Sequence, residues 1–147
     1  MLNKSWTITA LVEVPEKAEG IIVTQGGLEG GYGLYLRGGK PTFVYNFLSL
    51  ERPTIAAKEP VPAGKAKIVV DFAYDGKKGE FGKGGTVTIS VNDKAVAEGK
   101  LRRTIPVSVS ITEGLDIGED TGSAVDFTYK LPFKFTGKID KVTVELK

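Results

Sequence analysis

Two side chains that carry much of enzyme chemistry are missing from the 147 residues, because the chain has neither cysteine nor histidine. Without cysteine there can be no disulfide and no thiolate metal site. Without histidine the chain lacks the commonest general base and the commonest metal ligand. A Ser-His-Asp or Cys-His nucleophile is therefore excluded.

Long apolar runs and a clustered excess of charge are also missing. No apolar run approaches the ~20 residues that span a bilayer, and residues 1–13 alternate as a strand does and lack the apolar core of a signal peptide. We expect a soluble chain with no membrane partner. Lysine and arginine number 20 against 18 acidic residues, and the densest basic stretch lies in a glycine-rich loop, so no nucleic-acid partner is expected.

The acidic residues are not spaced for glycoside hydrolysis, which needs two carboxylates flanking one bond. Glu113, Asp116 and Glu119 come closest, but a spacing of three does not place three side chains on one face of a strand. The chain is therefore expected not to be an enzyme and to need no cofactor. Asp116, Glu119 and Asp120 could instead supply oxygen ligands to Ca²⁺, the alternative being a solvated acidic turn.

Period-2 alternation of apolar residues recurs along the chain, and no stretch of ten or more residues shows a helical period. The alternation predicts strands at 6–12, 21–24, 32–36, 42–47, 66–74, 87–91, 94–101, 105–111 and 142–146. Asn92-Asp93 predicts a two-residue hairpin turn, because both residues tolerate positive φ. About ten short strands with turns between them predict one all-β domain over 1–147, a sandwich or a barrel.

Aromatic side chains gather on two consecutive expected strands. Tyr32 and Tyr35 lie on the first, and Tyr45 and Phe47 lie on the second. Rings on an exposed sheet face can stack on sugars, whereas rings on an inner face fill the core. The sequence leaves both interpretations open.

Several short blocks occur together in a familiar order. They are Ile21–Gly27, Gly33–Leu36, Tyr45–Arg52, Phe72–Gly76, Gly82–Thr86, Asp116–Gly122 and Pro132–Ile139. As a set they resemble the C-terminal accessory domain of bacterial arylsulfatases. The resemblance implies a two-sheet antiparallel jelly-roll sandwich similar to the concanavalin A-like lectins and glucanases. It also implies a parent enzyme that hydrolyses sulfate esters and is periplasmic or secreted, although the compartment stays open.

The leading hypothesis is a non-catalytic accessory domain, a fragment of a larger enzyme that docks on a sulfatase catalytic domain. The family's nucleophile comes from a [CS]-x-P-x-R motif, which this chain lacks, so no catalytic residue is carried over. The candidate contacts are the Asn46–Arg52 segment, with Glu51 and Arg52 as charged members, and the long segment 112–137.

The second hypothesis is a carbohydrate-binding module for anionic glycans. Its candidate ligand contacts are Tyr35, Arg37, Tyr45 and Arg52. It predicts an exposed, concave aromatic face, and the hypothesis fails if Tyr35 and Tyr45 are both buried.

Overall fold

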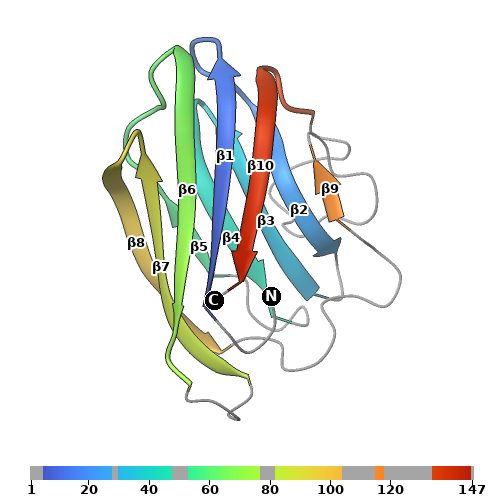
Figure 1. The fold of residues 1–147 in the computed structure, drawn as a ribbon, viewed down its shortest axis with the longest axis vertical. Helices are drawn as coiled ribbons and strands as arrows, with labels where there is room; N and C mark the ends of the chain where they lie inside the picture. The colour runs from blue at the N-terminus through green and yellow to red at the C-terminus, as the bar shows by residue number, and fades with distance from the viewer. Residues whose placement is uncertain are drawn as a thin grey trace.

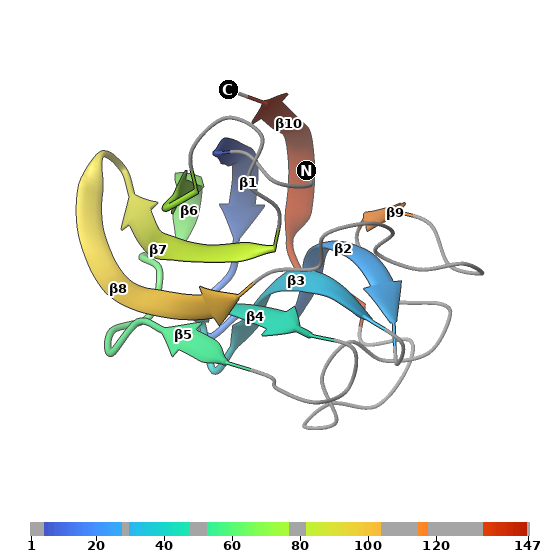
Figure 2. The ribbon, with the colours of Figure 1, turned by 90° about the horizontal axis from the view of Figure 1, so that it is seen from below.

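The computed structural model describes residues 5–27, 30–47, 53–76, 82–103, 115–117 and 134–146. In these ranges every regular element is a β-strand, and the strands form two five-stranded sheets that face each other as layers (Figures 1 and 2). All pairings between neighbouring strands are antiparallel. The fold is thus an all-β, two-sheet jelly-roll sandwich, as the strand pattern together with the resemblance implies.

The first layer, called sheet A here, contains the first and the last strand of the fold. Across the sheet its strands are β10 (Lys138–Leu146), β1 (Trp6–Val14), β6 (Gly64–Tyr74), β7 (Lys83–Val91) and β8 (Lys94–Arg103). Strand β10 therefore lies beside β1, although the two are far apart in the chain (Figure 1).

The second layer, sheet B, is built mostly from consecutive strands. Across the sheet they are β5 (Thr54–Ala56), β4 (Lys40–Asn46), β3 (Gly30–Arg37), β2 (Gly20–Gly27) and β9 (Leu115–Ile117). The chain passes from sheet A to sheet B after β1 and returns after β5, so both layers are needed to complete the fold.

The core lies between the two layers because each central strand turns its alternate apolar residues inward. Trp6 is at its centre and is 2% exposed. Its ring lies 5.3 Å from the ring of Phe72 in sheet A, and 5.6 Å and 5.9 Å from those of Phe43 and Tyr32 in sheet B. These tilted and offset rings join the two sheets and contribute beyond their buried area.

The expected strands that fall in the described ranges are all present. Asn92 and Asp93 form the turn between β7 and β8 with φ values of 50° and 69°, which confirms the predicted hairpin. Strands β5 and β9 were not expected, because three residues are too few to show alternation. The strand expected at 105–111 lies outside the described residues. Among the described residues no helix is long and apolar enough to span a bilayer.

Candidate functional site

The predicted aromatic platform is wrong, because its two tyrosines are buried. Tyr35 is 1% exposed and Tyr45 is 7% exposed. Tyr45 points into the core between the sheets, together with Phe43 and Phe47. Tyr35 alternates with Leu34 and Leu36 of the core and therefore lies on the opposite face of sheet B. The two rings face opposite ways, and neither can stack on a sugar from solvent.

Two further candidates share the outer face of sheet B with Tyr35. The guanidinium carbon of Arg37 lies 5.2 Å from the centre of the Tyr35 ring, an arrangement that holds the cation against the ring. Asn46, at the end of β4, is completely buried. Thr24 on β2 is also buried, and its hydroxyl has no hydrogen-bond partner within the described residues. On this face of sheet B, Thr24, Tyr35 and Asn46 are therefore buried and Arg37 is half-buried.

The remaining candidates cannot be placed. Glu51, Arg52, Glu119 and Asp120 lie outside the described residues. Asp116 is in β9, where its backbone pairs with that of Thr24, but its side chain is outside the description. Within the described residues no three acidic side chains are grouped as a metal site would require. The Ca²⁺ site stays a prediction.

An open cavity lies at one end of sheet A, where the sequence did not predict a site. It has a volume of about 320 Å³, within the usual range for small-ligand sites. It is lined by residues from β10, β1, β6 and the β7–β8 turn, which are neighbours across sheet A. We call it the end cavity and define it by Leu11, Val12, Lys65, Ala66, Lys67, Asn92 and Asp140.

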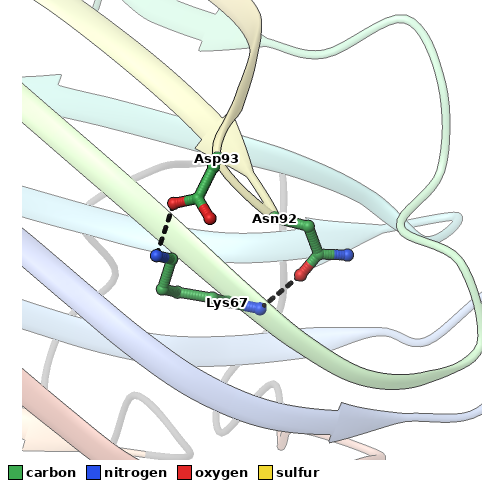
Figure 3. A network of polar contacts seen from close by, with 3 residues as sticks. All are labelled: Lys67, Asn92 and Asp93. Carbon is green, nitrogen blue, oxygen red and sulfur yellow. Dashed lines mark hydrogen bonds and ion pairs between the residues drawn. The ribbon is translucent and has the colours of Figure 1, made fainter.

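One wall of the end cavity is held rigidly by the β7–β8 turn. The backbone N–H of Lys67 donates to Asn92 Oδ1 at 2.9 Å, and the backbone N–H of Asn92 donates to the Lys67 carbonyl at 2.9 Å. The Lys67 ammonium also pairs with Asp93 Oδ1 at 2.5 Å (Figure 3). Because Oδ1 of Asn92 is already engaged, its amide N–H groups are the part of the side chain left for a ligand.

The opposite wall is formed where β1 and β10 change register. Leu11 pairs with Lys141 but Val12 pairs with Ile139, so Asp140 is the extra residue of a β-bulge. Leu11 is 39% exposed, one of few large apolar side chains exposed among the described residues. The lining of the cavity thus combines the apolar residues Leu11, Val12 and Ala66 with polar groups.

A second, smaller cavity shares Asn92 with the end cavity. Its volume is about 160 Å³, and its lining comes from the proline-containing segment after β5 and from the β7–β8 hairpin. It includes Pro60, Pro62, Val91, Lys94 and Val96.

The sequence contained two signals for the end cavity. Leu11 is the one residue that breaks the apolar alternation of the first strand, and the structure explains this exception by its place on the outer face. The Asn92-Asp93 pair predicts a turn, but the sequence does not indicate that this turn lines a site. The cavity itself depends on β10 lying beside β1, which alternation within each strand does not predict.

Comparison with known proteins identifies the fold and no family. No family model and no curated protein matches the chain. Among solved structures, mouse laminin α1 domains LG4-5 are 11% identical, with a TM-score of 0.66 over 99% of this chain and 37% of that one. The CBM40 of Ruminococcus gnavus IT-sialidase, bound to α2,3-sialyllactose, is 13% identical, with a TM-score of 0.61 over 96% and 75%.

A heptameric SAP-like pentraxin from Limulus polyphemus is 11% identical, with a TM-score of 0.56. The match covers 98% of this chain and 66% of the pentraxin chain. At these identities the likeness shows the fold alone, a two-sheet jelly-roll sandwich, and nothing in the comparisons ties the chain to arylsulfatases.

Proposed function

We propose that this chain is a non-catalytic, lectin-like module that binds an anionic carbohydrate in the end cavity. The observation that carries the proposal is the cavity itself, an open space across three neighbouring strands and the β7–β8 turn, with a preformed wall and few polar groups. Small-ligand sites commonly combine an apolar lining with a small number of placed polar groups.

The polar groups that line the cavity suit a sugar that carries a negative charge. Lys65 is exposed, and the ion pairs within the described part of the chain do not include its ammonium. Asn92 presents amide N–H donors, while Asp140, whose Oδ1 lies 3.7 Å from the Lys138 ammonium, presents a carboxylate that can also accept from sugar hydroxyls. Since the Lys67 ammonium is already paired with Asp93, we assign recognition of the anionic substituent to Lys65.

The fold supports this choice of ligand class at a coarse level. Sialyllactose, the sugar bound to the similar CBM40 structure, carries a carboxylate. The proposal does not use the aromatic face predicted from Tyr35 and Tyr45, because those rings are buried. The proposed ligand is still an anionic glycan, but its binding site is on sheet A instead of sheet B.

The test is binding of the purified chain to 3′-sialyllactose and to a sulfated oligosaccharide, with lactose as the neutral probe, measured by calorimetry. We expect Lys65→Ala to weaken binding of the acidic probes about tenfold or more, since a charged hydrogen bond contributes ~1.5–3 kcal/mol. Lys65→Arg should retain most of the affinity. Lys100→Ala, at an exposed lysine of β8, is the matched control.

Two results would contradict the proposal. The first is that the intact chain binds none of the probes and no acidic sugar on a glycan array. The second is that binding is unchanged by both Lys65→Ala and Asp140→Ala, which would place any sugar site elsewhere.

Attachment to a sulfatase is a separate hypothesis that rests on the sequence resemblance alone. It is compatible with glycan binding, since an accessory domain can hold the polymer that its enzyme acts on. Sequencing the gene upstream tests it: a [CS]-x-P-x-R motif in the same reading frame would support it, and a continuous gene without that motif would refute it.

A further inference from the structure

Strand β10 is the edge strand of sheet A in the part of the chain that the structure describes. Within the described residues it pairs with β1 only, whereas β8, at the other end of the sheet, packs against β5 of sheet B. Figure 2 shows β10 at the margin of the layer. Every second residue of an edge strand directs its N–H and C=O groups away from the sheet, so that they can pair with another strand.

The two faces of β10 differ in chemistry. Lys141, Thr143 and Glu145 pair with Leu11, Thr9 and Thr7, so they lie on the outer face of sheet A. Val142 and Val144 pair with Ala10 and Ile8 and lie on the inner face. Although Ile8 is fully buried, Val144 is 38% exposed, so the inner face of the edge strand is incompletely covered.

The order of these residues makes β10 complementary to itself. In an antiparallel pair of two β10 strands centred on Thr143, Lys141 of each copy lies opposite Glu145 of the other. The same register places Val142 opposite Val144 on the inner face. Opposite charges and apolar residues that face each other directly stabilise a strand pair, and like charges destabilise it.

Registers centred on the other residues from Lys141 to Glu145 lack this match, and the bulge at Asp140 interrupts regular pairing before Lys141. A pair centred on Lys141 puts two lysines opposite each other, and a pair centred on Glu145 puts two glutamates opposite each other. A centre on Val142 places Lys141 opposite Thr143. The charges from Lys141 to Glu145 therefore disfavour the other registers of this strand pair and favour the one centred on Thr143.

We propose that two copies of this chain associate through β10 in the register centred on Thr143. The contact is isologous, with a two-fold axis at Thr143, and it joins the two copies of the five-stranded sheet A into one continuous sheet. One strand pair buries little area, so the dimer should be in exchange with the monomer and should weaken as salt screens the charges.

The test is sedimentation velocity of the full chain over a range of concentrations at low and high salt. We expect the sedimentation coefficient of the wild type to rise with concentration. Lys141→Glu, which places Glu opposite Glu twice, should raise the dimer Kd about tenfold, and Glu145→Lys should do the same by placing Lys opposite Lys. An equimolar mixture of the two variants restores both attractive pairs and should form a mixed dimer. Lys100→Glu, on β8 at the other end of sheet A, is the control and should leave association unchanged.

Hydrogen exchange gives a second measurement, because alternate amides of β10 should gain protection as the concentration rises. The proposal is overturned if the wild type stays monomeric up to about 1 mM, where even weak specific association is visible. It is also overturned if the two variants dimerise as well as the wild type, or if their mixture shows no association. Loss of glycan binding leaves these results unchanged, so the two proposals can fail separately.

Discussion

Phe43 tests the packing of the core most directly. Its side chain is completely buried, and its ring lies 5.6 Å from Trp6 and 6.2 Å from Tyr32. Replacing a buried phenylalanine by alanine costs ~3–5 kcal/mol, because apolar contacts are lost and a cavity remains. A domain of this kind has a free energy of unfolding of ~5–15 kcal/mol. We therefore expect Phe43→Ala to remove a large fraction of the stability.

The assay is urea unfolding followed by the fluorescence of Trp6, the only tryptophan of the chain. With a loss of about 4 kcal/mol and a slope of about 2 kcal/mol/M, the midpoint should fall by about 2 M. Leu11→Ala is the control on the outer face, where a side chain that is 39% exposed should cost about 1 kcal/mol or less. Equal midpoint shifts for the two variants would refute the assignment of inner and outer faces.

Two further predictions concern Tyr32 and the glycines. Burial, with a smaller contribution from Tyr45, raises the pKa of Tyr32 above its ordinary value. Since Tyr32 ionises first in the unfolded chain, its contribution to the free energy of unfolding should be constant below pH ~10 and fall by about 1.4 kcal/mol per pH unit above it. Tyr32→Phe should therefore flatten the fall in stability above pH ~10 in urea titrations. A Cβ on Gly20 would meet the backbone of Lys134, whereas one on Gly38 meets nothing within 4 Å. In thermal melts Gly20→Ala should therefore destabilise far more than Gly38→Ala, although both have positive φ, and similar losses would contradict this packing.

The sequence predicts the strands well because alternation is a local property. In β6, Ala66, Ile68, Val70 and Phe72 are all inward and buried, and the residues between them are not. The pairing of strands is not local. Nothing in the alternation of β1 says that its neighbours are β6 and β10, and the jelly-roll arrangement was reached through resemblance instead.

The candidate site was predicted poorly for a related reason. Tyr35 and Tyr45 have the same residue type and lie on adjacent strands, but they face opposite sides of sheet B. Alternation places each ring relative to its own strand, and only the packing of the second layer shows which face becomes the core. An aromatic residue on a strand is thus a weak indicator of a sugar platform until the faces are assigned.

The end cavity is favoured as a site because three local irregularities meet there. Asn92 and Asp93 have positive φ, Asp140 lies in a β-bulge, and Leu11 exposes an apolar side chain. Each irregularity has an ordinary explanation alone, since a hairpin needs a turn and a bulge can end a pairing. These irregularities lie in separate parts of the chain, however, namely in β1, in β10 and in the β7–β8 turn. Even so, Leu11, Asp140 and Asn92 all line one cavity. Local rules are broken most often where function requires it, and this convergence is the structural reason to test Lys65 and Asp140 before any other surface residue.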